Sequence, residues 1–245
     1  MKNKSTYDSI GGLFENFTDT AAQRAVEVRT LMHMAGDVKG QSVLDLACGY
    51  GFFGRELLRK GASHVVGVDI SEKMIDLARE ESRKNGDTIE FHVRNVCNME
   101  SFGKFDMVMA AWLFNYAESL DDMKKMFKAV ANNLKPSGRL VAYTVEPDFQ
   151  LAKGNFTNYG VNVLTEEPWG EGFRHQAEFV TTPPSPFTFF RWSREDYDAA
   201  MADAGLREVH WQKPMLLDSD IKRYTPGFWD TFQENCLQTG LTCRL

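Results

Sequence analysis

The chain has 245 residues, 43% of them hydrophobic and 25% charged, which is typical of one globular α/β domain with a full core. Its formal net charge is −6 and it has no lysine- or arginine-rich run, which argues against nucleic acid as a partner. The amino-terminal residues are polar and no apolar run approaches ~18 residues, so we expect a cytoplasmic protein without membrane association.

The first predicted element is helical and covers much of residues 5–36. Thr18 or Asp19 is placed to cap a helix that begins near Ala21, and Gly36 is placed to end it. We therefore treat residues 1–36 as an amino-terminal helical segment that precedes the main α/β unit.

Strands and helices then alternate from residue 42 to residue 147. Strands are predicted at 42–47, 64–69, 89–94, 105–112 and 139–147, and helices at 52–60, 71–85 and 119–134. Ser71 caps the second of these helices and Gly86 stops it. Such alternation predicts a mostly parallel sheet that helices cover on both faces, with residues 37–147 as its core.

The first predicted strand leads directly into a glycine-rich turn, Cys48-Gly49-Tyr50-Gly51, and the second strand ends at Asp69. This order of strand, glycine turn, helix, strand and acid is typical of a βαβ unit that binds an adenosine cofactor. Gly49 and Gly51 allow the backbone to approach a ligand, and the Asp69 carboxylate can accept both hydroxyls of a ribose.

Two cofactor classes compete for this unit. Residues 49–54 read G-x-G-x-x-G, the dinucleotide pattern, but so short a pattern is weakly specific. Asp45 precedes the turn, where its carboxylate would repel a pyrophosphate and attract an ammonium group. A strand that opens Phe105-Asp106 and a turn at residues 134–138 that feeds another strand add two further motifs.

With these motifs, residues 40–146 resemble the class I S-adenosylmethionine-dependent methyltransferases. The resemblance implies a Rossmann-like sheet, mostly parallel with its last strand antiparallel, and S-adenosylmethionine as methyl donor, leaving S-adenosylhomocysteine. The cofactor-binding residues it implies are Tyr7, Phe17, Asp45, Ala47, Gly49, Gly51, Asp69, Ile70, Met74, Asn95, Val96 and Ala111. Asn95 departs from the family, which often has an Asp there to accept from the adenine amino group.

Residues 148–192 break the alternation and are rich in aromatic residues, Gly and Pro. Residues 172–180 and 186–192 are predicted to pair as an antiparallel hairpin, which forms an insertion for the acceptor substrate. Residues 193–245 follow as a carboxyl-terminal segment: a helix capped by Ser193 and ended by Gly205, a last strand at 206–211, and a final helix around 227–232.

A narrower resemblance, at residues 7–14 and 185–192, is to the toxoflavin-pathway N-methyltransferases, which act on an azapteridine. It implies methylation of ring nitrogens on a small flat heterocycle. Tyr7 and Trp112 would position the in-line transfer, with the amino-terminal segment as a lid. The substrate-binding residues are then Tyr7, Phe14, Trp112, Asn115, Tyr116, Arg174, His175 and Trp192.

Methyl transfer from a sulfonium is a direct displacement, so no covalent enzyme intermediate and no metal is required. A ring N–H flanked by carbonyls is acidic, so no strong catalytic base is expected either. The four cysteines, Cys48, Cys97, Cys236 and Cys243, also lack metal-binding spacing. Alternatives remain open: another small amine, phenol or carboxylate as substrate, an NAD-dependent dehydrogenase, or a non-catalytic module that binds the cofactor. The chain is expected to be a monomer or a homodimer.

Overall fold

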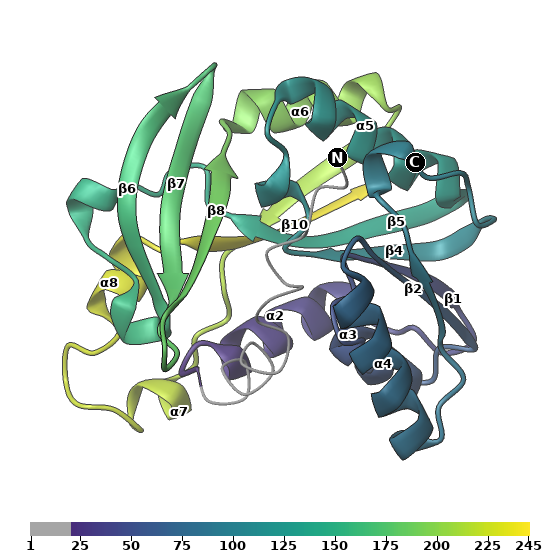
Figure 1. Cartoon of the computed structure of the whole chain (residues 1–245), viewed down its shortest axis with the longest axis horizontal. Helices are drawn as coiled ribbons and strands as arrows, with labels where there is room; N and C mark the ends of the chain where they lie inside the picture. Colours follow the sequence, from purple (N-terminus) through teal and green to yellow (C-terminus); the bar gives the residue numbers. More distant parts are fainter. Residues whose placement is uncertain (1–20) are drawn as a thin grey trace.

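A computed structural model describes residues 21–245 and contains a seven-stranded sheet flanked by helices, beside a separate three-stranded sheet (Figure 1). The strands are β1 (Ser42–Leu46), β2 (His64–Asp69), β3 (Glu90–Val93), β4 (Phe105–Ala111), β5 (Leu134–Val145), β6 (Val161–Trp169), β7 (Gly172–Phe179), β8 (Ser185–Arg191), β9 (Arg207–Gln212) and β10 (Gln238–Arg244). The α-helices are α2 (Arg24–Ala35), α3 (Phe52–Arg59), α4 (Glu72–Asn85), α5 (Leu120–Asn133), α6 (Arg194–Asp203), α7 (Asp218–Ile221) and α8 (Asp230–Glu234).

The large sheet has the order β3-β2-β1-β4-β5-β10-β9. Strands β1 to β5 are parallel to one another, and β10 runs antiparallel to both β5 and β9. This arrangement confirms the predicted Rossmann-like sheet, mostly parallel with its last strand antiparallel. The carboxyl ends of β1, β2 and β4 therefore meet at one edge, where open α/β sheets bind ligands.

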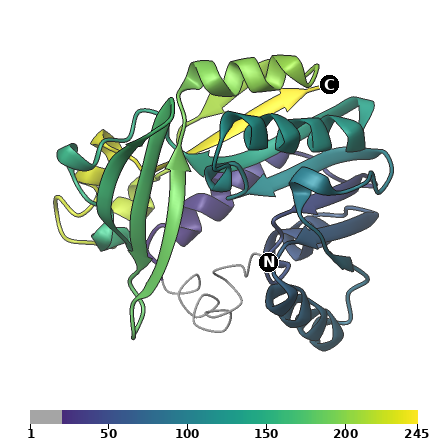
Figure 2. The same cartoon turned by 45° about the horizontal axis from the view of Figure 1, so that its top comes forward.

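Both faces of the large sheet are buried because successive side chains of a strand point to opposite sides. On one face, residues such as Val43 and Met107 pack with apolar side chains of α2, α3 and α4. On the other face, their neighbours Leu44 and Val108 pack with α5 and α6. Figure 2 shows α5 and α6 above the large sheet and α4 below it.

The insertion forms a three-stranded antiparallel sheet in the order β6-β7-β8. The predicted hairpin corresponds to β7 and β8, and β6 is an additional strand that the prediction omitted. A third hydrophobic cluster, which includes Val145, Phe149, Phe156 and Trp229, joins this sheet to the end of β5 and to α8. The insertion sheet is thereby fixed next to the carboxyl edge of the large sheet (Figure 1).

The carboxyl-terminal segment differs in part from the prediction. The Ser193 cap, with Asp196 completing a capping box, and the 206–211 strand are present as α6 and β9. The tail, however, does not end in a helix: the helical turn α8 is followed by β10, which inserts between β5 and β9. The antiparallel strand of the fold is thus β10, a segment that we had not predicted as a strand.

Candidate functional site

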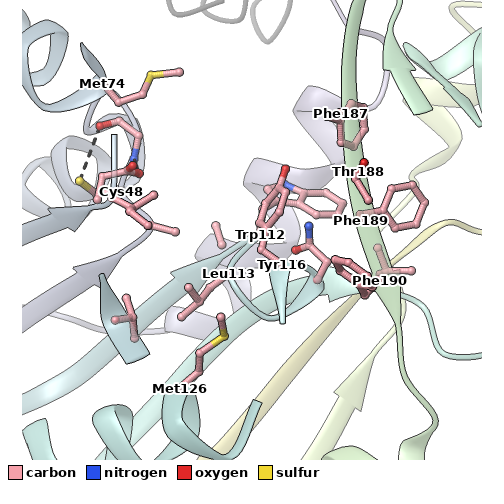
Figure 3. A pocket seen from close by; sticks show the side chains of 18 of the residues that line it. Cys48, Met74, Trp112, Leu113, Tyr116, Met126, Phe187, Thr188, Phe189 and Phe190 are labelled. Atoms are coloured by element: carbon pink, nitrogen blue, oxygen red, sulfur yellow. Dashed lines mark hydrogen bonds between the residues drawn. The ribbon is translucent and has the colours of Figure 1, made fainter. Parts of the chain in front are cut away.

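A cavity of about 1110 Å³ opens at the carboxyl edge of the large sheet and extends to the insertion sheet. Figure 3 shows Met74 and Cys48 on one side, Phe187 to Phe190 of β8 on the other, and Trp112 and Tyr116 between them. Pockets that bind one drug-sized ligand typically measure about 300–1,000 Å³. The cavity is therefore large enough for a nucleoside cofactor and a small acceptor side by side.

The turn after β1 forms one wall of the cofactor half. Ala47, Gly49 and Gly51 all have positive φ angles, of 55°, 53° and 83°. A Cβ built on Gly49 meets no heavy atom within 4 Å, whereas one on Gly51 lies 2.8 Å from Cζ of Phe91. Ala47 and Gly49 line the cavity and Gly51 does not. Gly49 thus permits close approach of a ligand, while Gly51 is needed for packing under the turn.

The Asp69 carboxylate lies at the end of β2, lines the cavity, and is held by two backbone amides. Gly49 N–H donates to its Oδ2 at 2.9 Å, and Ser71 N–H donates to its Oδ1 at 2.8 Å. Ser71 in turn caps α4 through a hydrogen bond from Met74 N–H to its Oγ. A carboxylate has about four acceptor positions. Two anchoring amides therefore orient Asp69 and are compatible with the predicted contact to a ribose diol.

Four of the predicted cofactor-binding residues lie together on the next part of the wall. Ile70, Met74, Asn95 and Val96 all line the cavity. Ile70 is 46% exposed although it follows a buried strand, whereas Met74 is buried. Ile70 therefore offers an exposed apolar side chain on this part of the cavity wall.

Asn95 has a second role that the sequence did not reveal. Its Oδ1 accepts a hydrogen bond from Cys97 N–H at 2.9 Å and so caps the short 3₁₀ turn Val96–Asn98. We expect Asn95→Asp to keep this cap and to bind S-adenosylmethionine about fivefold more tightly, because a charge-assisted hydrogen bond to the adenine amino group replaces a neutral one. Isothermal titration calorimetry measures the change. Asn85→Asp adds the same charge far from the cavity, and equal affinities of both variants would contradict the expectation.

Asp45 lies beneath the glycine turn and not in the cavity wall. The residue is 2% exposed, and its Oδ2 has no hydrogen-bond partner among residues 21–245. Burial raises the pKa of this carboxyl to about 7; a hydrogen bond from the Gly54 backbone and the charge of Arg55 oppose the shift, and the Asp69 charge adds to it. The predicted attraction between the Asp45 carboxylate and the ammonium group of the cofactor would therefore act across the backbone of the turn.

Trp112 and Ala111 line the cavity where β4 ends, as the sequence predicted for this strand. Trp112 has a φ of 61°, unusual for a bulky residue, and its backbone N–H donates to Tyr143 O at 2.7 Å. Its indole Nε1–H donates to Oε1 of Glu27 at 2.7 Å. The indole is thus fixed from both its backbone and its ring.

Glu27 joins the two halves of the cavity, and the sequence analysis missed it. Its other oxygen accepts from Arg24 Nη1 at 3.0 Å, and the Arg24 guanidinium lies 4.1 Å from the ring centroid of Phe52, just after the glycine turn. Glu27 and Trp112 are 85 residues apart, and no local pattern marks a glutamate inside a helix as the partner of such a residue. A chain of contacts therefore runs from the turn to Trp112.

Aromatic side chains dominate the acceptor half of the cavity. They are Tyr116, Phe156, Trp169, Phe179, Phe187, Phe189 and Phe190, most of them from the insertion sheet. Asn115 and Arg174 add polar groups to this wall. The guanidinium of Arg174 binds Glu167 at 2.7 Å and lies 4.8 Å from the Trp169 ring centroid. The predicted residues Asn115, Tyr116 and Arg174 are thus brought together.

His175 and Trp192 do not line the cavity. His175 is fully buried on the opposite side of β7 from Arg174, where its Nε2 lies 2.9 Å from Glu166 Oε2 and its ring stacks on Phe189. Burial lowers the pKa of His175, while Glu166 opposes this shift. Trp192 is in the main core, and its Nε1–H donates to Ala117 O at 3.0 Å. Both residues are therefore placed as structural groups.

Three predicted residues, Tyr7, Phe14 and Phe17, lie outside the described residues. Of the predicted lid, residues 1–36, the structure describes residues 21–36, and α2 within them packs on one face of the large sheet. Within residues 21–245, no His, Cys, Asp and Glu side chains gather in a group that could hold a metal ion. A search of that range also finds no helix with the length and apolar character to cross a membrane.

Comparisons with known proteins agree with this geometry. Residues 43–138 match the family model described as a methyltransferase domain. The demethylmenaquinone methyltransferase of Lactococcus lactis is 33% identical over 169 residues, which cover 65% of this chain and 62% of that protein. The chain spans less than two thirds of the length of the curated relatives it matches first.

Two solved structures are similar in fold. An S-adenosylmethionine-dependent methyltransferase from Mesorhizobium loti has a TM-score of 0.66 at 20% identity, covering 93% of this chain and 100% of that chain. The CcbJ methyltransferase from Streptomyces caelestis has a TM-score of 0.67 at 16% identity, covering 98% of each chain. Residues 43–138 thus match a methyltransferase domain, and the order of the large sheet agrees with the fold that these two structures share with this chain.

Proposed function

We propose that this protein transfers a methyl group from S-adenosylmethionine to a small flat heterocycle, preferably to ring nitrogens of a toxoflavin-type azapteridine. The observation that carries the proposal is that the cofactor half and a half walled by aromatic side chains form one continuous cavity. Flat heterocycles stack well on such rings, which also exclude water. Trp112, held by Glu27, lies where the two halves join.

The residues present fit an S-adenosyl group: an open glycine turn, an oriented carboxylate at Asp69 and an exposed apolar side chain at Ile70. The bound cofactor supplies an electrophilic methyl group on a sulfonium. The chain then has to hold the acceptor nitrogen in line with that methyl group and exclude water. A ring N–H between two carbonyls is acidic enough to react without a strong base, so none is assigned.

A second acceptor class, a quinone-like ring, is favoured by one observation. The Lactococcus lactis relative is named a demethylmenaquinone methyltransferase, and it is similar to this chain over 65% of its residues. Such a ring is also flat and apolar, and would be methylated at carbon. It differs from the azapteridine in having no ring N–H group.

Mass spectrometry of a reaction with S-adenosylmethionine tests the proposal. Purified protein is incubated with a demethylated toxoflavin precursor, and in parallel with a demethylated naphthoquinol. Methylated azapteridine together with S-adenosylhomocysteine, absent without protein, supports the proposal. Turnover of the naphthoquinol alone replaces it with the second acceptor class. Cofactor binding without either product would retain the domain assignment and refute both acceptors.

A further inference from the structure

Two buried glutamines meet in the cavity wall. Gln23 precedes α2 and is 8% exposed, and Gln238 begins β10 and is 1% exposed. They are 215 residues apart in sequence, and both line the cavity on the side of the large sheet. Gln238 pairs with Val145 at the end of β5, and Val145 lines the cavity as well. The pair therefore belongs to the acceptor half, near the base of the insertion.

A hydrogen bond joins the two amides. Gln238 Nε2 donates to Gln23 Oε1 at 2.6 Å. With Gln238 as the donor, its Oε1 points away from Gln23. This oxygen is buried and has no hydrogen-bond partner among residues 21–245.

A second buried oxygen in the same wall has the same property. Asn115, which follows β4, is 2% exposed and lines the cavity, and its Oδ1 also lacks a partner within the described part of the chain. Trp112, close to Asn115 in sequence, uses its indole N–H on Glu27. Gln238 Oε1 and Asn115 Oδ1 are thus two buried acceptor oxygens in the wall of this cavity. A buried carbonyl oxygen without a donor is costly and calls for an explanation.

We propose that Gln238 is a specificity-determining residue whose Oε1 accepts an N–H hydrogen of the methyl-accepting substrate, while Asn115 Oδ1 accepts a second. Gln23 is the positioning residue that turns the Gln238 oxygen toward the ligand. This inference rests on the proposed function and narrows it: the acceptor is a flat heterocycle with at least two hydrogen-bond donors. Replacing such an N–H by N–CH₃ leaves a buried oxygen unpaired, and sites of this kind reject the altered ligand strongly.

The test compares wild type, Gln238→Met and Gln238→Glu. Met has nearly the same length but removes the acceptor oxygen, so we expect the KM for the demethylated azapteridine to rise about 10- to 100-fold, with kcat and the Kd for S-adenosylmethionine little changed. Glu retains an acceptor oxygen toward the ligand, and its other oxygen can accept from Gln23 Nε2–H once the Gln23 amide turns over, so it should restore part of the loss. The exposed Gln233 provides the matched control, Gln233→Met, which should behave as wild type.

Ligand binding separates this inference from the proposed function. Pteridine-2,4-dione and its N-methylated forms are titrated into the S-adenosylhomocysteine complex of each protein. Preference of wild type for the N–H form, lost in Gln238→Met and kept in Gln238→Glu, supports the role of Gln238 even if no heterocycle is methylated. If Gln238→Met does not fold, the wild-type and Gln238→Glu titrations still show whether the site prefers the N–H form. Equal binding of N–H and N–CH₃ forms by wild type, or no binding, overturns the inference.

Discussion

Asp69→Ala is expected to weaken binding of S-adenosylmethionine by at least about 100-fold. Two hydrogen bonds from a ribose diol to a carboxylate, each worth about 1.5–3 kcal/mol, account for a loss of that size. The anchoring amides of Gly49 and Ser71 lose their acceptor as well, so the turn is less well held around the ligand. Calorimetric titration with S-adenosylhomocysteine and with S-adenosylmethionine measures the change.

Two further variants make this result interpretable. Asp76→Ala removes one negative charge from the exposed surface of α4, close to the site but outside the cavity, and should leave the Kd unchanged. Asp69→Asn keeps one carbonyl oxygen and should give an intermediate loss. Thermal unfolding of each protein shows whether the fold is intact. A folded Asp69→Ala protein with a Kd within threefold of wild type would refute the assigned contact.

The cofactor half of the site was largely predictable because its determinants are local in sequence. A strand, a glycine turn and a helix fix where Gly49 lies, and the end of the next parallel strand brings Asp69 to the same edge. Each strand of a parallel sheet can be predicted from its own apolar run and from the turn residues that follow it. The order of the sheet then follows from the resemblance of these motifs to a known family.

The acceptor half depends on register and on distant pairs, which a single sequence does not encode in a readable form. Arg174 and His175 are adjacent on β7, so their side chains must point to opposite faces, and only the fold decides which one lines the cavity. Glu27 with Trp112, and Gln23 with Gln238, are joined across 85 and 215 residues. Neither pair has a spacing that could have indicated it.

Strand β10 was missed because its composition is unusual for a buried strand. It includes Gln238, Thr239 and Gly240, which are all buried, so it lacks the apolar run that predicts a central strand. Gly240 has a packing reason: a Cβ there would lie 2.6 Å from Cε of Met34 on α2. The helix packs against the strand at this glycine, and that contact is visible only once both elements are placed.

The second large effect concerns Asp45 and the dependence of stability on pH. The pKa of this carboxyl is raised from 3.8 to about 7, mainly by burial, so its charged form is disfavoured in the folded state. Its contribution to stability is fully present below the unfolded pKa near 3.8 and is lost as pH rises through about 7. Above that pH the folded chain contains a buried charge at a cost on the order of 4 kcal/mol.

Asp45→Asn should therefore remove this pH dependence. We expect the free energy of unfolding of wild type to fall between pH 5 and pH 8.5 relative to that of Asp45→Asn, by a few kcal/mol, as urea titrations at a series of pH values would measure. Asp106→Asn is the contrasting variant, because Lys135 and Ser42 hold the pKa of Asp106 down to about 2 and its ionised form is the stable one. A constant difference between wild type and Asp45→Asn across this range would contradict the expected burial effect.

The same carboxyl should make cofactor binding depend on pH. An ammonium group on the far side of the glycine turn is attracted only by the ionised form of Asp45, so binding must remove the proton below about pH 7. The Kd for S-adenosylhomocysteine is then expected to rise up to about tenfold for each pH unit below that value in wild type, and to stay flat in Asp45→Asn. Calorimetry in buffers of different ionisation enthalpy counts the proton released. If wild-type affinity is the same at pH 5.5 and pH 8, the charge of Asp45 has no part in holding the methionine moiety, and its burial serves the turn alone.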